Sequence, residues 1–226
     1  MLPLHSSARG SRSQMAIQPC RRVIIPNTHT VICGMTRSGK THLAKRLVRE
    51  WKGPAFCWDA QMEDFPGIGV AGHSTVEDIL AALHAGEHLN YYPPAQTERA
   101  NLVLEVIVSR VIGRTRWRPP LLLVIDEAQD YAPNGKPNCL EFVARRGLRF
   151  GVHGLFISQR PADMHKTLLT QSYTFVLFQT QWEGAYFSSK HFPLEQIDAT
   201  LSAAGPYSYV VRHGGRLQGP FKETPT

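Results

Sequence analysis

The stretch "VICGMTRSGKTHLAKRLV" contains residue types at a spacing suited to binding phosphate. Gly34, Gly39, Lys40 and Thr41 complete the pattern Gly-x-x-x-x-Gly-Lys-Thr. Glycines let the backbone turn tightly enough for its N–H groups to point at phosphate oxygens, and the lysine reaches the β- and γ-phosphates. The threonine hydroxyl is a ligand for Mg²⁺. The sequence therefore predicts an ATP–Mg²⁺ site lined by Gly34, Met35, Thr36, Arg37, Ser38, Gly39, Lys40, Thr41 and His42.

The segments on either side of this loop fit a phosphate site. A short β-rich run, "HTVICG", precedes it, and Leu43, Leu47 and Trp51 follow at a spacing typical of a helix. The amino end of such a helix adds a positive dipole beneath the phosphates. An ordinary glycine-rich turn is the alternative, but it would not require a strand before it and a helix after it.

A second run, "LLLVIDEAQD", carries two acids where a buried strand ends. Asp126 is placed to hold the Mg²⁺ through its water shell, and Glu127 to orient and deprotonate a water that attacks the γ-phosphate. The alternative is a buried strand that ends in two solvated acids. A small-molecule kinase would not need a water-activating glutamate, so the pair favours hydrolysis.

Gln159 ends another apolar run, in "LFISQRP". The carboxyl ends of parallel strands share one edge of a sheet. We therefore expect Gln159 near Glu127, where it would sense the γ-phosphate or help to place the water. Its alternative role is to cap a helix that starts near Pro161.

Strand-like and helix-like runs alternate along the chain, which predicts an α/β domain with a mostly parallel sheet flanked by helices. "AFCWDA", "HGLFISQ" and "YTFVLFQT" are further expected strands. Helices are expected over "STVEDILAALHAG", where Ser74 and Glu77 have capping-box spacing, over "ERANLVLEVIVSRVIG" and over "LEQIDATLSAAG". "FPGIGVAGH" is expected to be a glycine-rich loop, and the last residues a β-hairpin that turns at Gly214-Gly215.

Composition sets outer limits on the function. The chain has 226 residues, 42% hydrophobic and 19% charged, with a net charge of +7. These values are typical of a globular protein and allow a polyanionic partner. The four cysteines are far apart and show no metal-binding spacing, which favours an intracellular protein. No apolar run is long enough to cross a membrane. We expect a flexible basic tail over residues 1–20, although its Ser/Arg bias also fits a transit peptide, and one ATPase domain over residues 21–226.

Three segments together resemble a known family. "GMTRSGKT", "LLLVIDEAQD" and "ARRGLRFGVHGLFISQRPADM" are similar to motifs of the FtsK/HerA group of DNA translocases, and Gln-Arg-Pro is the discriminating element. The resemblance runs from Thr30 to about Thr180. It implies a RecA-like P-loop NTPase with an additional strand, which acts as a ring on double-stranded DNA. A hexamer and a pentamer both remain open.

The small size narrows the resemblance. Only about thirty residues precede the phosphate loop, as in the minimal genome-packaging ATPases of membrane-containing icosahedral viruses. That likeness implies a capsid or membrane vertex protein as a partner. It also implies a place in the host cytoplasm or at a packaging vertex of the virion.

Family members complete a neighbour's site with an arginine. In this chain the candidates are Arg145, Arg146 and Arg149, because the family's position falls on Leu148. A solvated basic helix face is the alternative for each. Such a cation would stabilise the charge that develops in the transition state.

Candidate DNA contacts lie in two loops. "GRTRWRPP" places Trp117 among Arg114, Arg116 and Arg118, an arrangement that could hold a phosphate backbone, and Lys136 lies in a second loop. A plain basic loop is the alternative. Scattered histidines, His42, His73, His84, His153 and His165, show no metal-ligand spacing.

Two other functions remain open. One is a related motor for plasmid or chromosome transfer, or for export of phage DNA. The other, from a different class, is a nucleotide-gated assembly protein that binds ATP without moving DNA.

Overall fold

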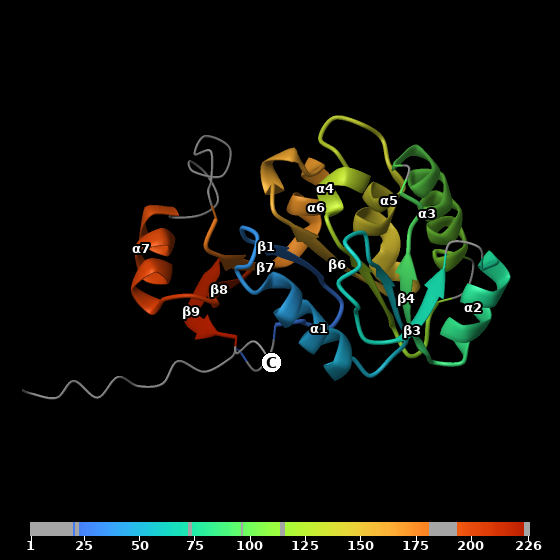
Figure 1. Cartoon of the computed structure of the whole chain (residues 1–226), viewed down its shortest axis with the longest axis horizontal. Helices are drawn as coiled ribbons and strands as arrows, with labels where there is room; N and C mark the ends of the chain where they lie inside the picture. The colour runs from blue at the N-terminus through green and yellow to red at the C-terminus, as the bar shows by residue number, and fades with distance from the viewer. Residues whose placement is uncertain are drawn as a thin grey trace, which may run out of the picture.

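A computed structural model describes residues 20, 23–71, 74–95, 97–113, 116–180 and 194–223. Within these ranges, nine strands form one sheet with helices on both faces (Figure 1). The strands are β1 (His29–Cys33), β2 (Ala55–Trp58), β3 (Ile68–Ala71), β4 (His88–Tyr92), β5 (Leu121–Ile125), β6 (Val152–Ser158), β7 (Ser172–Phe178), β8 (Ser208–His213) and β9 (Arg216–Lys222). The α-helices are α1 (Lys40–Glu50), α2 (Val76–His84), α3 (Thr97–Val111), α4 (Ala128–Tyr131), α5 (Cys139–Arg146), α6 (Lys166–Gln171) and α7 (Leu194–Ala204).

The order of the strands is β3-β4-β2-β5-β6-β1-β7-β8-β9. The pairs from β3 to β7 are parallel, and the hairpin of β8 and β9 joins β7 in antiparallel fashion. β6 lies between β1, which leads into the phosphate loop, and β5, which ends in the acidic pair. This inserted strand is the feature of the additional-strand type, so the predicted fold class is confirmed.

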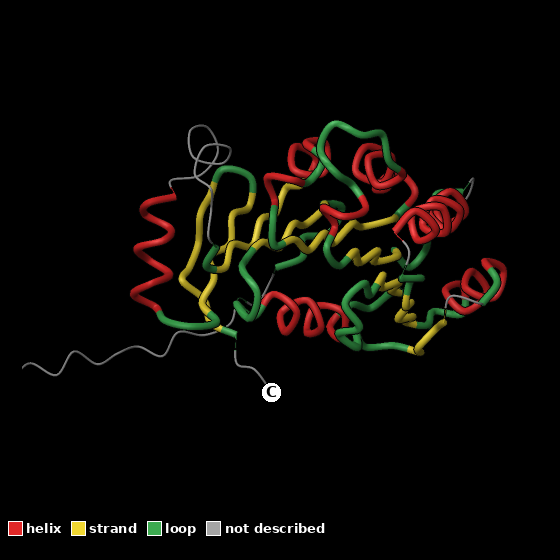
Figure 2. The backbone as a smooth tube through the Cα atoms, turned by 45° about the horizontal axis from the view of Figure 1, so that its top comes forward, coloured by secondary structure: helices red, strands yellow, loops and turns green. Residues whose placement is uncertain are grey.

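Alternation of apolar side chains along the strands divides the core between the two faces of the sheet. Ile32 packs with Leu43 and Leu47 of α1 on one face, whereas Val31 and Cys33 belong to the core of the other. Figure 2 shows α1 alone beneath the strands, with α3, α5 and α6 on the opposite side. Because both faces are covered, β5 has five buried residues in succession, which explains its uniformly apolar sequence.

Two local predictions were wrong. The expected loop "FPGIGVAGH" contains β3, an edge strand that pairs with β4. Gly67 before it has φ 145°, and a Cβ there would lie 2.5 Å from the carbonyl oxygen of His88. Gly67 lets the chain approach β4 closely enough to pair with it. The same glycine content made the sequence look like a loop. The capping box of α2 is formed by Thr75 and Asp78, one residue later than predicted.

Other elements follow the prediction more closely, with one omission. The final hairpin turns at Gly214, where φ is 56°, as the Gly-Gly pair indicated. β4 was not predicted, because its sequence "HLNYY" places a polar Asn90 in the strand. The helix expected near Pro161 is a short 3-10 helix over Pro161–Asp163, which precedes α6.

The tail predicted over residues 1–20 lies outside the described residues, apart from Cys20. The domain boundary at residue 21 therefore stays a prediction. Among the helices of the described ranges, none is long and apolar enough to span a bilayer.

Candidate active site

The phosphate loop joins β1 to α1, and its two motif glycines occupy positions where a side chain would not fit. Gly39 has φ 107°, a left-handed conformation that favours glycine. A Cβ at Gly34 would lie 2.6 Å from the Cβ of Phe178 and 2.6 Å from Oγ of Ser38. Any larger residue at Gly34 would therefore displace the loop from β7.

Backbone hydrogen bonds attach the loop to the ends of two neighbouring strands. The N–H of Gly34 donates to the carbonyl of Ser158 at 3.3 Å, and the N–H of Met35 donates to that of Gln179 at 2.9 Å. The loop is thus fixed to the carboxyl ends of β6 and β7. Its middle residues, Met35, Thr36 and Arg37, are exposed.

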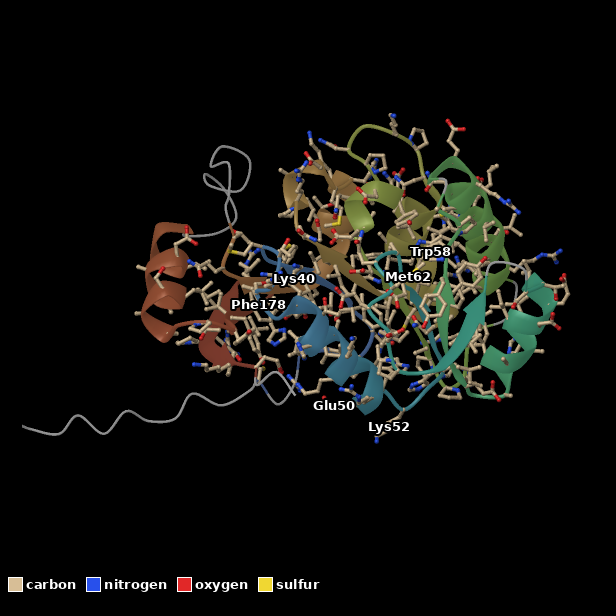
Figure 3. All side chains as sticks on the ribbon, in the orientation of Figure 1. Lys40, Glu50, Lys52, Trp58, Met62 and Phe178 are labelled. Carbon is tan, nitrogen blue, oxygen red and sulfur yellow. The ribbon has the colours of Figure 1, made fainter. Side chains whose placement is uncertain are left out.

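Lys40 is buried beneath the loop, near Phe178 of β7 (Figure 3). Its Nζ donates to the carbonyl of Met35 at 2.9 Å. Burial lowers the pKa of Lys40, while Glu127 and Asp126 act in the opposite direction and favour its charged form. Thr41 and His42, the next two residues of the predicted site, are half-buried in the first turn of α1.

Asp126 directly follows β5, and its N–H donates to the carbonyl of Trp58 at 3.1 Å. Its side chain is only 3% exposed. Burial, followed by the charges of Glu127, Asp59 and Glu63, raises the pKa of Asp126 to about 7. A cation beside this carboxylate would offset the repulsion and favour its ionised form.

Glu127 lies within a chain of hydrogen bonds that reaches the phosphate loop. One carboxylate oxygen accepts a hydrogen bond from Nε2 of Gln159. The other accepts from Nε2 of Gln129 at 2.6 Å. Oε1 of Gln159 in turn accepts from the hydroxyl of Thr36 at 2.6 Å. Gln159 therefore links the exposed part of the loop to Glu127, so the two lie close together as predicted.

The polar atoms of this edge fit a nucleotide with its magnesium ion. Oγ of Ser38 and Oδ2 of Asp126 are buried and have no hydrogen-bond partner among the described residues. Buried polar atoms are normally paired, so both are suited to a ligand. The donor set, a hydroxyl from Thr41 and a carboxylate from Asp126, is the oxygen chemistry that Mg²⁺ prefers.

A further acid at this edge was not predicted. Asp59 directly follows β2, is fully buried, and accepts hydrogen bonds from the N–H groups of Glu63 and Asp64 at 2.8 and 2.9 Å. Nδ2 of Asn90 donates to it at 3.0 Å. The signal was an acid at the end of the apolar run "AFCW", the same pattern that identified Asp126. Asp59 folds the 59–64 loop back toward the site and adds to the negative potential at Asp126.

The candidate arginines lie at the opposite edge of the sheet from the acidic pair. Arg145 and Arg146 are in the last turn of α5, and Arg149 is in the 3-10 helix that leads into β6. All three are exposed. Arg145 pairs with Glu141 at 2.7 Å, and Arg146 lies 5.3 Å from the ring centre of Phe142.

The structure changes the interpretation of the basic loop before β5. Trp117 is buried, donates from Nε1 to the carbonyl of Val111 at 2.8 Å and stacks on His84, so it is a core residue and not a surface for DNA. Arg116 and Arg118 are exposed on either side of it. Arg114 lies outside the described residues, and Lys136 is exposed in a turn after α4.

Comparison with solved structures identifies the fold. The genome-packaging NTPase B204 of Sulfolobus turreted icosahedral virus 2, in complex with AMP, superimposes with a TM-score of 0.62. The match covers 89% of this chain and 100% of that one at 14% identity. The fold is that of a P-loop NTPase. The DNA-packaging ATPase B204 of Sulfolobus turreted icosahedral virus gives a TM-score of 0.59 at 14% identity, over 88% of this chain and 100% of that one.

One further solved structure and one short sequence match are also similar to this chain. EssC of Geobacillus thermodenitrificans matches with a TM-score of 0.51 at 9% identity, over 87% of this chain and 39% of that chain. In sequence, 64 residues are 33% identical to the DNA double-strand break repair helicase HerA of Pyrococcus furiosus. That match covers 26% of this chain and 12% of HerA. No family profile matches the chain. The resemblance to the FtsK/HerA group is confirmed by these likenesses.

Proposed function

We propose that this P-loop NTPase is an ATP-driven ring motor that translocates double-stranded DNA and packages a viral genome into a capsid. The observation that carries the proposal is the hydrogen-bonded chain from Thr36 through Gln159 to Glu127. It connects the loop that would hold ATP to a carboxylate placed to activate water. Such a connection suits hydrolysis better than nucleotide binding alone.

Each residue of the site has a distinct task in hydrolysis. Lys40 and the N–H groups of the phosphate loop bind the phosphates, and Thr41 and Asp126 would hold Mg²⁺, which when bound neutralises charge on the β- and γ-phosphate oxygens. Glu127 takes the proton of the attacking water. Gln159 reports whether a γ-phosphate is present, because its amide contacts both the loop and the base.

The motor would work as a ring in which one of the three candidate arginines completes the site of the next subunit. Arg145, Arg146 and Arg149 are exposed and lie at the edge of the sheet away from their own nucleotide. A cation supplied in this way stabilises the charge of the transition state. A capsid or membrane protein at the packaging vertex would hold the ring in place. The motor would then be found in the host cytoplasm and at that vertex of the virion.

Separation of charge within the domain supports DNA as the partner. The acids of the site lie where the parallel strands end, whereas many exposed basic residues lie where the strands begin. These basic residues are Arg49, Lys52, Arg110, Arg116, Arg118, Arg145, Arg146 and Arg149. Among the described residues, the acids at this edge are Glu50, which pairs with Arg46, and Glu87. The phosphate backbone of DNA would be attracted to this basic edge.

The deciding experiment measures ATP hydrolysis and DNA binding together. We expect double-stranded DNA to stimulate turnover, and binding to be independent of sequence and to weaken steeply with salt, because each neutralised phosphate releases counterions. Arg116→Ala with Arg118→Ala should reduce the salt slope by about 0.9 for each phosphate that the loop no longer neutralises. The matched pair Arg99→Ala with Arg216→Ala removes the same charge elsewhere and should leave the slope unchanged.

Other outcomes would point to other functions. Turnover that ignores DNA would favour a nucleotide-gated assembly protein. Tight, sequence-specific binding that persists in high salt would contradict a packaging motor, since base contacts would stall it at favoured sites. A preference for single-stranded DNA would favour a motor for plasmid transfer or phage export.

A further inference from the structure

We infer that Tyr207 is the platform on which the purine base of the bound nucleotide stacks. The inference rests on the proposed function, since it requires the phosphate loop to hold a nucleoside triphosphate. It adds a residue at the start of the predicted carboxyl-terminal hairpin, a segment to which the sequence assigned no role in nucleotide binding.

The order of the strands sets the direction in which the nucleotide lies. β6 and β5 follow β1 on one side, and β7 and β8 follow it on the other. Glu127 and Gln159 are at the ends of β5 and β6, so the γ-phosphate must lie on that side. A triphosphate is a short linear chain, and its nucleoside therefore leaves the loop on the opposite side, toward β7 and β8.

Tyr207 is in the turn between α7 and β8, at the place to which the nucleoside is directed. A Cβ built on Gly39 would lie 3.3 Å from Cδ1 of Tyr207 and 3.2 Å from Cε1 of Phe178. The tyrosine ring thus borders the glycine that immediately precedes Lys40. It is half-buried, so part of the ring is open to a ligand.

The backbone of Tyr207 is strained and held in place. Its φ is 61°, a left-handed conformation that is costly for a bulky residue and that persists only where the surroundings impose it. The N–H of Glu223 donates to its carbonyl at 3.0 Å.

A second contact fixes this turn to the helix of the phosphate loop. The buried carboxylate of Glu223 accepts hydrogen bonds from Nε of Arg46 at 2.8 and 3.1 Å. Arg46 belongs to α1, which begins at Lys40. The position of the Tyr207 ring relative to the phosphate site is therefore set through Glu223 and Arg46, as a rigid stacking surface requires.

The experiment compares the affinity for Mg²⁺-ATP with that for Mg²⁺-tripolyphosphate, which carries phosphates but no base. Stacking of one base on an aromatic ring is a large enough contribution that its loss weakens binding about tenfold or more. We expect Tyr207→Ala and Tyr207→Leu to weaken ATP binding by that factor and to leave tripolyphosphate binding within about twofold. Tyr207→Phe should retain the affinity for ATP. Tyr173→Ala removes an exposed tyrosine from β7 and should affect neither ligand.

Two results would overturn the inference. Equal losses for ATP and tripolyphosphate would show that Tyr207 only supports the loop, and undiminished ATP affinity in Tyr207→Leu would show that the base lies elsewhere. Thermal unfolding shows whether each variant folds. If Tyr207→Ala does not fold, the comparison of Tyr207→Leu with Tyr207→Phe tests the inference instead. If the wild-type chain binds neither ligand, the proposed function itself fails, which is a separate result.

Discussion

Glu127 holds its carboxylate between two amide groups, those of Gln159 and Gln129. Its backbone has φ 49°, in the left-handed region, so the residue turns the chain sharply out of β5 and into α4. Both carboxylate oxygens are thereby directed and paired. If Glu127 is the general base, as we propose, the hydrogen bonds from Thr36 to Gln159 and from Gln159 to Glu127 would couple nucleotide binding to that base.

Replacing this base tests hydrolysis at the scale of one residue. Glu127→Gln should bind ATP with little change but turn over at least ~100-fold more slowly, the usual scale for loss of a general base. Steady-state hydrolysis and equilibrium binding of ATP measure the two effects separately. Glu77→Gln, on the exposed surface of α2, is the matched control and should be as active as the wild type. Near-normal turnover in Glu127→Gln would remove this residue from the mechanism.

Among the secondary-structure elements, the sequence was most informative where a signal is contiguous in the chain. The phosphate loop and the acids after β5 were predictable because strand, glycines and polar residues follow one another directly. Asp59 had the same signal, an acid directly after an apolar run, but its hydrogen bond with Asn90 in the middle of β4 was not predictable, because it joins two strands that become neighbours only when the sheet forms. The burial of Trp117 could not be predicted, because its arginine neighbours gave no sign that this side chain packs inward. β3 was missed because Gly67 and Gly69 resemble a loop until a partner strand is present.

The amino end of α2 tests the corrected capping box. The hydroxyl of Thr75 accepts from the N–H of Asp78 at 3.1 Å. Loss of such a cap costs about 1 kcal/mol, so Thr75→Ala should lower the free energy of unfolding by about that amount. Ser74→Ala, at the position first expected to cap the helix, should leave it unchanged. Denaturant titration compares the two variants, and a larger effect at Ser74 would restore the original assignment.

His29, the first residue of β1, should make the stability of the domain depend on pH. Burial, and to a smaller extent the nearby His153, lowers the pKa of His29 to about 4. In the unfolded chain His29 therefore binds a proton near pH 6.5, whereas in the folded chain it stays neutral at that pH. The contribution of neutral His29 to the free energy of unfolding is complete above pH 6.5 and is lost as the pH falls toward 4. His29→Gln, which does not titrate, should show a shallower fall in unfolding free energy between these pH values. An identical fall in both proteins would contradict the prediction.

The acids of the candidate site lie at one edge of the sheet, and the three candidate arginines lie at the other. In a ring this arrangement would let the basic edge of one subunit face the nucleotide of the next. Arg145, Arg146 and Arg149 are all exposed there, so each is a candidate to reach the neighbouring site.

Mixing experiments test the ring and identify the arginine. Each of Arg145→Ala, Arg146→Ala and Arg149→Ala is mixed in turn with Glu127→Gln. A subunit without the arginine but with Glu127 would be completed by a neighbour that has the arginine, so for one of the three variants the mixture should regain turnover that neither protein shows alone. Loss of a trans arginine lowers turnover by about 10³-fold or more, which makes the recovery easy to measure. Arg216→Ala on β9 is the control and should be as active alone as the wild type. A dilute monomer that hydrolyses ATP at full rate would contradict the ring.

The two outermost strands also determine how copies of the domain can associate. At one end β3 has only four residues and includes Gly69, and at the other β9 contains Pro220, which has no N–H to offer a further strand. A register shift between β8 and β9 distorts that margin further. Neither margin is a good template for backbone pairing with another chain. At high concentration the domain should therefore resist aggregation by cross-β stacking. An oligomer would be held together by side-chain contacts and not by pairing of edge strands.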